Sequence, residues 1–174
     1  YKKRLSTLEE GTKVKVRGPE GQFLLHQDYS KEAVFLSGGI GVTPFRTMIK
    51  YATDKQLPLK IVMFDSNRNR VNIIFRKEFD EWANVNKNLK IIYTISEDQH
   101  GQQSSTTAKN DDWKGEYGRI DKAMILKYVD INMLNNSIFY ICGPPSMIKT
   151  MQTLLEEGLK IPNEQIKVEE FTGY

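Results

Sequence analysis

The sequence predicts an α/β fold, with five strands in a parallel sheet and helices on both faces. Short apolar runs rich in β-branched and aromatic residues recur along the chain, and turn-forming residues follow them. Stretches with helical spacing of apolar residues separate these runs. Strands that alternate with helices form parallel sheets with right-handed crossovers, and ligands of such sheets bind beyond the carboxyl ends of the strands.

The individual elements follow from the same patterns. Strands are expected at about 33–36, 59–64, 89–95, 137–142 and 166–171, and helices at about 44–52, 75–86, 121–129 and 147–158. The first 31 residues differ from the rest, because polar and apolar residues alternate at 13–17 and a second apolar run occupies 23–25. These two segments predict β-structure, although two strands cannot form a stable sheet alone.

Composition narrows the function classes. The chain has 174 residues, of which 39% are hydrophobic and 27% charged, as is typical of a globular protein. A net charge of +3 is too small to indicate a nucleic-acid partner, and no apolar run is long enough to span a membrane. The single cysteine, Cys142, excludes an internal disulfide and a multi-cysteine metal site within this sequence. We therefore expect no metal and a cytoplasmic location.

The segment from Ser37 to Pro44 organises the prediction. An apolar strand breaks into three glycines within four positions, Gly38, Gly39 and Gly41. Thr43 and Pro44 follow as the expected N-cap and first residue of a helix. Backbone N–H groups at such a helix start can bind phosphate. The alternative is an ordinary turn that needs glycine only for its shape, and the spacing is not that of G-x-G-x-x-G.

A second strand–turn–helix segment runs through Cys142-Gly143-Pro144-Pro145-Ser146-Met147. Cys142 falls at the carboxyl end of its strand, where ligands bind, although a lone cysteine there is usually a small core residue. Nucleophilic catalysis would need a nearby base, and His26 and His100 are the only histidines in the sequence, so we discount it.

Polar residues follow the second strand of the sheet. In a dinucleotide-binding fold this position lies near the adenine ribose. Ser66 and Arg68 could bind a 2′-phosphate there, and a polar loop without a ligand is an equally good interpretation of the same residues.

Taken together, these segments resemble the ferredoxin-NADP reductase-like flavoprotein family over nearly the whole chain. Five stretches in the family's order carry the resemblance: Gly18-Pro19-x-Gly21-x-Phe23, the turn 37–44, Ser66-Asn67-Arg68 with the helix start 74–79, Trp113-x-Gly115-x-x-Gly118-Arg119, and Cys142-Gly143-Pro144-Pro145-x-Met147. The resemblance implies strand order 3-2-1-4-5. It also implies that residues 32–174 form the NAD(P)-binding domain and that residues 1–31 are the C-terminal remnant of a flavin-binding β-barrel.

The resemblance also implies roles for individual residues. Cys142 would lie beside the nicotinamide, Phe171 would stack on the flavin ring, and Glu169 would act near the ring's edge. Because three residues follow Phe171, Tyr174 is an alternative cover for the flavin. The implied cofactor-binding residues are Gly38, Gly39, Ile40, Gly41, Val42, Thr43, Pro44, Ser66, Arg68, Glu97, Gly143, Pro144, Pro145, Met147 and Tyr174.

Two departures from the family pattern shape the expectation. The family's Arg-x-Tyr-Ser/Thr motif, which binds the flavin, is absent, so we expect this sequence to lack the first part of the flavin domain. NADPH-specific members often carry Ser-Arg after the third strand, where this sequence has Ser96-Glu97. An acidic group there repels a 2′-phosphate and favours NADH, whereas Arg68 favours NADPH.

The sequence therefore predicts the NAD(P)H-binding part of a flavin-dependent oxidoreductase that uses FAD in the complete protein. Its partners would be the missing flavin-domain segment and an electron acceptor such as a ferredoxin, haem or quinone. One alternative is a nucleotide-binding or subunit-interaction module without turnover of its own. Another, a phosphate-binding domain of unrelated chemistry, would leave the Cys-Gly-Pro-Pro stretch unexplained.

Overall fold

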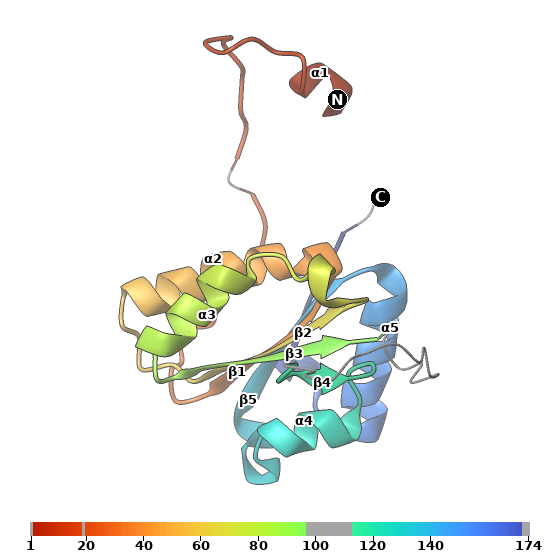
Figure 1. Cartoon of the computed structure of the whole chain (residues 1–174). Helices are drawn as coiled ribbons and strands as arrows, with labels where there is room; N and C mark the ends of the chain where they lie inside the picture. Colours follow the sequence, from red (N-terminus) through yellow and green to blue (C-terminus); the bar gives the residue numbers. More distant parts are fainter. Residues whose placement is uncertain (1, 19, 97–112, 172–174) are drawn as a thin grey trace, which may run out of the picture.

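Parallel strands form one six-stranded sheet in the computed structural model, which describes residues 2–18, 20–96 and 113–171 (Figure 1). The strands are β1 (Glu32–Gly38), β2 (Ile61–Asn67), β3 (Leu89–Ile95), β4 (Glu116–Tyr117), β5 (Ser137–Gly143) and β6 (Ile166–Glu170). Their order is β4-β3-β2-β1-β5-β6. Every residue of β1 and of β5 is buried, as expected for neighbouring central strands covered on both faces.

Helices cover both faces of the sheet (Figure 1). On one face α2 (Val42–Asp54) and α3 (Arg76–Val85) close a core around Phe35, Phe45 and Phe79. On the other face α4 (Lys122–Tyr128) and α5 (Pro145–Thr153) close a second core, and the π-helical turn η4 (Leu154–Gly158) continues α5. Short 3₁₀ turns connect the elements: η1 (Gly39–Gly41), η2 (Arg70–Asn72), η3 (Ile131–Asn136) and η5 (Asn163–Gln165).

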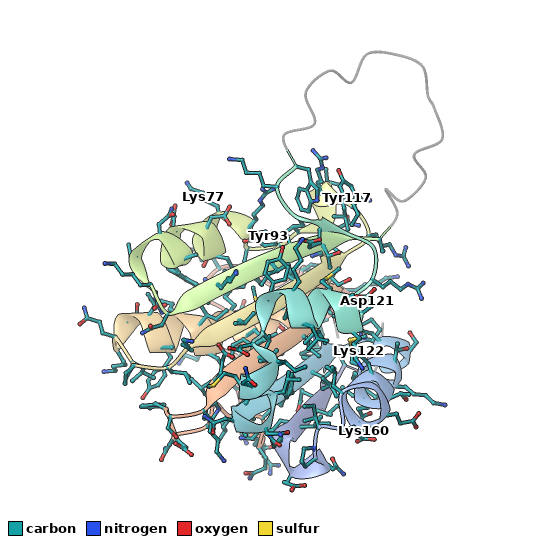
Figure 2. All side chains as sticks on the ribbon, turned by 90° about the horizontal axis from the view of Figure 1, so that it is seen from below. Lys77, Tyr93, Tyr117, Asp121, Lys122 and Lys160 are labelled. Atoms are coloured by element: carbon teal, nitrogen blue, oxygen red, sulfur yellow. The ribbon has the colours of Figure 1, made fainter. Side chains whose placement is uncertain are left out.

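Helix α4 begins where the sequence predicts it. The Asp121 carboxylate accepts a hydrogen bond of 2.7 Å from the backbone N–H of Met124, which satisfies one of the free donors of the first turn (Figure 2). Long charged side chains such as Lys77 extend outward from the molecule in the same view. The polar faces of the helices are therefore solvated, while their apolar faces cover the sheet.

The five expected strands occur in the expected order, but the sheet has a sixth member. Strand β4 adds two residues at the edge, pairing Thr94 with Glu116 and Ile95 with Tyr117. A strand of two residues is too short to show an alternating sequence pattern, so only its pairing with β3 in the folded chain defines it. The prediction of five strands was wrong in this respect.

The expected β-structure before residue 32 does not form in the described part of that segment. Residues 2–18 and 20–31 contain the one-turn helix α1 (Lys2–Leu5) and otherwise extended chain and turns. Residues 2–18 extend away from the sheet (Figure 1), and Val14 and Val16 are 59% and 84% exposed. An alternating segment becomes a strand only when a neighbouring strand pairs with it, and none of the described strands does so. The domain boundary at residues 31 and 32 stays a prediction.

Candidate functional site

A cleft of about 710 Å³ lies at the carboxyl ends of the central strands, and we call it the main cleft. It is lined by both predicted turns and by the loop after β2. Seven predicted residues line it: Gly38, Gly39, Ile40, Ser66, Arg68, Pro144 and Met147. The position matches the general rule for ligand sites of parallel sheets.

The glycines of the first turn have different structural roles. A Cβ atom on Gly38 would collide with the sulfur of Met147, and one on Gly41 would collide with the carbonyl oxygen of Cys142. Gly39 has φ of +54°, and a Cβ atom there would meet nothing within 4 Å. Gly38 and Gly41 therefore permit packing within the protein, whereas Gly39 shapes the turn and leaves space toward the main cleft.

The helix after this turn starts earlier than the sequence suggests. The 3₁₀ turn η1 leads directly into α2, whose first residue is Val42 and whose N-cap is Gly41. Thr43 is not the N-cap, because its hydroxyl donates a 3.0 Å hydrogen bond back to the carbonyl of Ile40. The N–H of Val42, the C-cap of this turn, bonds back to the carbonyls of Gly39 and Ile40, so the turn and the helix are continuous.

The second turn places another helix start at the same cleft. Pro144 is the N-cap of α5 and Pro145 its first residue, and the first N–H bonded within this helix is that of Ile148, to Pro144. Ser146 and Met147, which line the cleft, precede it. The start of the 3₁₀ turn η1 and the start of helix α5 thus border one cleft, and backbone N–H groups at helix starts favour an anionic group.

The far end of the main cleft is polar and positively charged. Arg68 and Arg119 both line it, together with Ser66, Asn67 and Ser96. Arg119 belongs to the Trp-x-Gly-x-x-Gly-Arg stretch but was not among the predicted site residues. Its place at the end of this stretch was the available signal in the sequence. Glu97 and Tyr174 lie outside the described residues.

A second cavity of about 430 Å³ joins the N-terminal segment to the sheet. Its lining comes from three parts of the chain: Glu20, Gly21, Phe23 and Leu24 before β1, Pro44 at the start of α2, and Glu169 and Phe171 at the end of β6. Glu169 and Phe171 were both predicted site residues. The structure therefore brings Pro44, Glu169 and Phe171 together in a cavity that shares no lining residue with the main cleft.

Cys142 lines neither cavity and is completely buried between β1 and β6. Burial, together with the charge of Glu169, raises the pKa of its thiol to about 12, so the group is protonated at neutral pH. A thiol of this kind is not a nucleophile. Gly41, Val42, Thr43, Gly143 and Pro145 are also absent from the lining of both cavities, although they shape the two turns.

A buried polar cluster that was not predicted from the sequence lies at the ends of β1 and β2, next to the first turn. Ser37 of β1 pairs in register with Asp65 of β2, and both are completely buried, while Asn67 is 5% exposed. Both carboxylate oxygens of Asp65, the Ser37 hydroxyl and the Asn67 amide nitrogen lack a hydrogen-bond partner of good geometry. Burial raises the pKa of Asp65 to about 7, and the nearby Asn67 and Ser37 only partly oppose this.

Comparison with known proteins defines the family. The model of the oxidoreductase NAD-binding domain matches residues 35–153, which include both turns and the loop after β2. The chain belongs to this family. Its fold and motifs are those of the NAD-binding domain of ferredoxin-NADP reductase-like flavoproteins, as the resemblance implied.

Two curated relatives illustrate the relationship. Each is the same component of a Na⁺-translocating NADH-quinone reductase, 29% identical over 173 residues in Idiomarina loihiensis and 30% identical over 172 residues in a Marinomonas species. In both cases the alignment covers 96% of this chain but only 39% of the relative. This chain therefore spans about two fifths of the length of these relatives.

Solved structures agree with this assignment. The CS-b5R domains of human Ncb5or, in the NAD⁺ form, match 98% of this chain and 45% of that chain, with a TM-score of 0.73 and 26% identity. The Amycolatopsis cytochrome P450 reductase GcoB matches 94% of this chain and 46% of that chain, with a TM-score of 0.71 and 18% identity, which supports the fold alone. Among the described residues no helix combines the length and apolarity needed to cross a membrane.

Proposed function

We propose that this chain is the part of a flavin-dependent oxidoreductase that binds NAD(P)H and presents it for hydride transfer. The observation that carries the proposal is the main cleft of this NAD-binding domain. The glycine turn, which has free space beside Gly39, and the start of helix α5 both line this cleft. A flavin held by the complete protein would supply the hydride-accepting chemistry, and electrons would then pass to an acceptor such as a ferredoxin, haem or quinone.

The residues of this chain would supply binding and alignment. The N–H groups at the starts of η1 and α5 would bind the pyrophosphate, and Arg68 and Arg119 would contact the adenosine end. Cys142, as a neutral buried thiol, would support the turn near the nicotinamide without chemistry of its own. The hydride-accepting chemistry belongs to the flavin, and the protein controls distance and orientation.

Calorimetric titration with NADH and with NADPH tests this proposal directly. We expect saturable binding of at least one of them to the chain as given. Wild-type chain that binds neither cofactor, while its circular dichroism shows a folded α/β domain, would refute the assignment of the main cleft. Titration with AMP then locates the binding energy, because AMP probes the adenosine end without the nicotinamide.

The second cavity fits the edge of a flavin but not the whole cofactor. Phe23, Pro44 and Phe171 offer apolar surface, and Glu20 and Glu169 are the charged residues of its lining. The lining holds no cation for the FAD phosphates. We therefore expect the isolated chain to bind little FAD, and absorbance at the flavin bands after purification with added FAD measures this. A stoichiometric yellow complex would contradict the expectation.

The preference between NADH and NADPH depends on charges of opposite sign. Arg119 adds to Arg68 at the polar end of the cleft and favours NADPH, whereas Glu97 disfavours it. We propose a modest preference for NADH. Glu97→Arg should lower the ratio of the NADPH dissociation constant to that of NADH, and an unchanged ratio would mean that Glu97 does not approach the ribose.

A nucleotide-binding or subunit-interaction module without turnover is the second candidate. It is favoured by the lining of the second cavity, which holds no cation. Steady-state reduction of ferricyanide by NADH with added FAD separates the two candidates. Turnover above the rate with FAD and NADH alone supports the enzyme, and binding without turnover supports the module.

A further inference from the structure

Residues 20–31 lie against the sheet through side-chain packing and individual hydrogen bonds rather than through strand pairing. Phe23 packs against Phe45 and meets the edge of Tyr140, with ring centroids 5.9 and 5.6 Å apart. The ammonium group of Lys167 donates a 3.1 Å hydrogen bond to the carbonyl of Leu24. Leu25 and Tyr29 also pack on the apolar core, and Asn136 donates a 3.0 Å hydrogen bond to the carbonyl of Ser30, so the polar contacts around His26 are one of several attachments.

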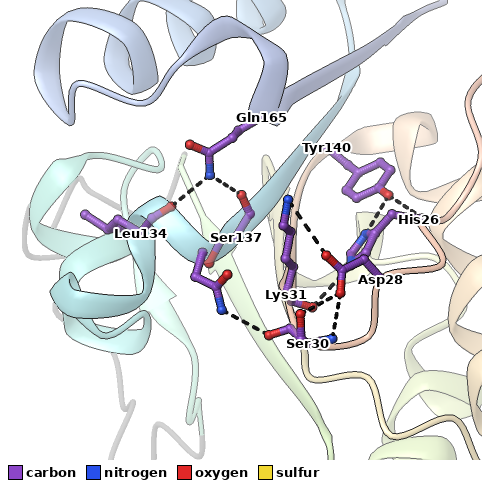
Figure 3. Close-up of polar contacts among 9 residues, drawn as sticks. His26, Asp28, Ser30, Lys31, Leu134, Ser137, Tyr140 and Gln165 are labelled. Carbon is purple, nitrogen blue, oxygen red and sulfur yellow. Dashed lines mark hydrogen bonds and ion pairs between the residues drawn. The ribbon is translucent and has the colours of Figure 1, made fainter.

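His26 and Tyr140 form the centre of the polar contacts (Figure 3). The backbone N–H of His26 donates to the Tyr140 hydroxyl over 2.8 Å, and the same hydroxyl lies 2.9 Å from Nδ1 of the His26 ring. Nε2 of the ring lies 3.2 Å from the carbonyl oxygen of Lys31. Because a carbonyl only accepts, Nε2 must carry the proton, and Nδ1 of the neutral ring accepts from the Tyr140 hydroxyl.

This arrangement is complete only when the histidine is neutral. The Tyr140 side chain is fully buried, and burial raises the pKa of its hydroxyl to about 12, so it remains a donor. Protonation of Nδ1 would turn the acceptor into a second donor toward the same oxygen. The Tyr140 hydroxyl would then receive two donors, and its own hydrogen would lose the acceptor it has now.

The surroundings of His26 also favour the neutral ring. Burial lowers its pKa, and the Lys31 carbonyl opposes this by accepting from the ring. Lys167 of β6 and Lys31 disfavour the charged ring, while Asp28 favours it. Asp28 is engaged locally, because its carboxylate accepts from the Ser30 hydroxyl and forms an ion pair of 3.8 Å with Lys31. His26 therefore has no directly bonded carboxylate to stabilise its proton.

We propose that His26 and Tyr140 form a proton-sensitive latch that holds residues 20–31 on the sheet and thereby sets the wall of the second cavity. The segment contributes Glu20, Gly21, Phe23 and Leu24 to that cavity, opposite Pro44, Glu169 and Phe171. Protonation of His26 releases the latch, and the cavity then opens on the side of residues 20–24. The latch concerns attachment of the segment and does not depend on the proposed oxidoreductase activity.

Amide hydrogen exchange of the wild-type chain at about pH 7.5 and about pH 5 tests the latch. Rates are expressed as protection factors, so that the intrinsic pH dependence of exchange cancels. We expect protection of residues 22–28 to fall at least about tenfold at the lower pH, roughly 1.4 kcal/mol of opening free energy. Protection within β1 and β5 should not change. A segment whose protection is independent of pH, or falls only together with these strands, overturns the proposal.

Tyr140→Phe removes the hydroxyl and its hydrogen bonds to His26, but keeps the ring that packs against Phe23 and Phe35. Residues 22–28 of this variant should already exchange rapidly at about pH 7.5, with little further change at the lower pH. The His26 pKa, followed by NMR with His100→Gln to assign the signal, should rise toward its ordinary value of 6.5.

Tyr128→Phe is the matched control. Its hydroxyl bonds to Glu116 on the other face of the sheet, so its removal should alter neither the protection of residues 22–28 nor the His26 pKa. Equal effects of the two tyrosine variants would overturn the latch. If Tyr140→Phe does not fold, the wild-type comparison at the two pH values decides alone.

Discussion

The two turns that border the main cleft share a strand–turn–helix layout but differ in how their residues are used. The turn after β1 has a glycine with positive φ whose Cα faces open space. The turn after β5 has two prolines and Met147, whose sulfur fills the space next to Gly38 and Gly143. The first turn therefore leaves free space beside Gly39, whereas the second both lines the cleft and packs its Met147 sulfur against the first.

The residue before each turn repeats this contrast. Ser37 and Cys142 pair in register at the ends of β1 and β5, and both are completely buried. A buried thiol needs no hydrogen-bond partner, whereas the Ser37 hydroxyl has none in the structure and lies beside the equally unpartnered Asp65. The unpartnered polar groups thus lie next to the first turn, for which we propose ligand binding.

The largest expected effect comes from wild-type Asp65, because its pKa of about 7 exceeds the ordinary value of 3.8. A carboxyl with a raised folded-state pKa favours the protonated form, so the free energy of unfolding should be highest below about pH 4. It should fall as the pH rises to about 7, by up to roughly 4 kcal/mol. Asp65→Asn should remove this slope and stabilise the chain at pH 8.

Urea unfolding of wild type and Asp65→Asn at about pH 4.5 and pH 8 measures this. Asp54→Asn is the control, because Asp54 is a solvent-exposed residue of α2 paired with Lys50. It should change the free energy of unfolding little at either pH. An equal stabilisation by Asp65→Asn at both pH values would show that ionisation of the Asp65 carboxyl does not cause the pH dependence of the free energy of unfolding.

Gly41→Val should break the contact between the two turns. The new side chain would collide with the backbone of Cys142 and Gly143, which cannot move without displacing the end of β5. We expect a loss of about 3 kcal/mol in the free energy of unfolding, together with loss of NAD(P)H binding. Thermal unfolding checks the stability, and Gly158→Ala, near a flexible Leu154 methyl group, provides a milder control.

Gly41 and Asp65 show which features could be predicted from the sequence and which could not. Gly41 stands in a recognisable turn, so its importance was predicted, but the physical reason was not. The pattern suggested ligand contact, whereas the structure shows contact with Cys142, 101 positions away in the chain by the residue numbers. Asp65 was invisible, because its burial depends on helices α2 and α3 covering one face of the sheet.

The same reason explains the other differences. Strand β4 and the fully buried Tyr140 hydroxyl acquire their roles from partners distant in sequence, Thr94 and His26. Local patterns, by contrast, were sufficient for β1, β5 and the Asp121 cap, since a buried apolar run or a capping side chain depends on its neighbours in the chain. Thr43 failed as a cap because the glycines before it already form a helical turn.

Gly39→Val tests the side of the contrast that faces the ligand. No protein atom lies within 4 Å of the added Cβ, so the side chain would occupy ligand space rather than collide with the fold. Positive φ adds a conformational cost of about 1–2 kcal/mol. We expect at least a tenfold weaker NAD(P)H complex, roughly 1.4 kcal/mol, from a chain that still folds. Calorimetry of Gly39→Ala, which has the same φ cost but less bulk, should show a smaller loss.

Arg119→Gln should have the smallest effect on cofactor affinity. It tests whether positive charge at the polar end of the main cleft strengthens cofactor binding beyond the contribution of the first turn. If the turn binds the pyrophosphate common to both cofactors, removing Arg119 should leave NADH affinity nearly unchanged. NADPH affinity should fall by about 1 kcal/mol, or roughly fivefold, because a partly solvated charge contact is worth no more. Arg17→Gln changes the net charge equally at a position 91% exposed and paired locally with Glu20, so it should affect neither cofactor. The ratio of the two dissociation constants in each variant is the measurement. An equal loss for NADH and NADPH would place Arg119 at the pyrophosphate, which both cofactors share, and the charge would then act together with the two turns rather than at the ribose.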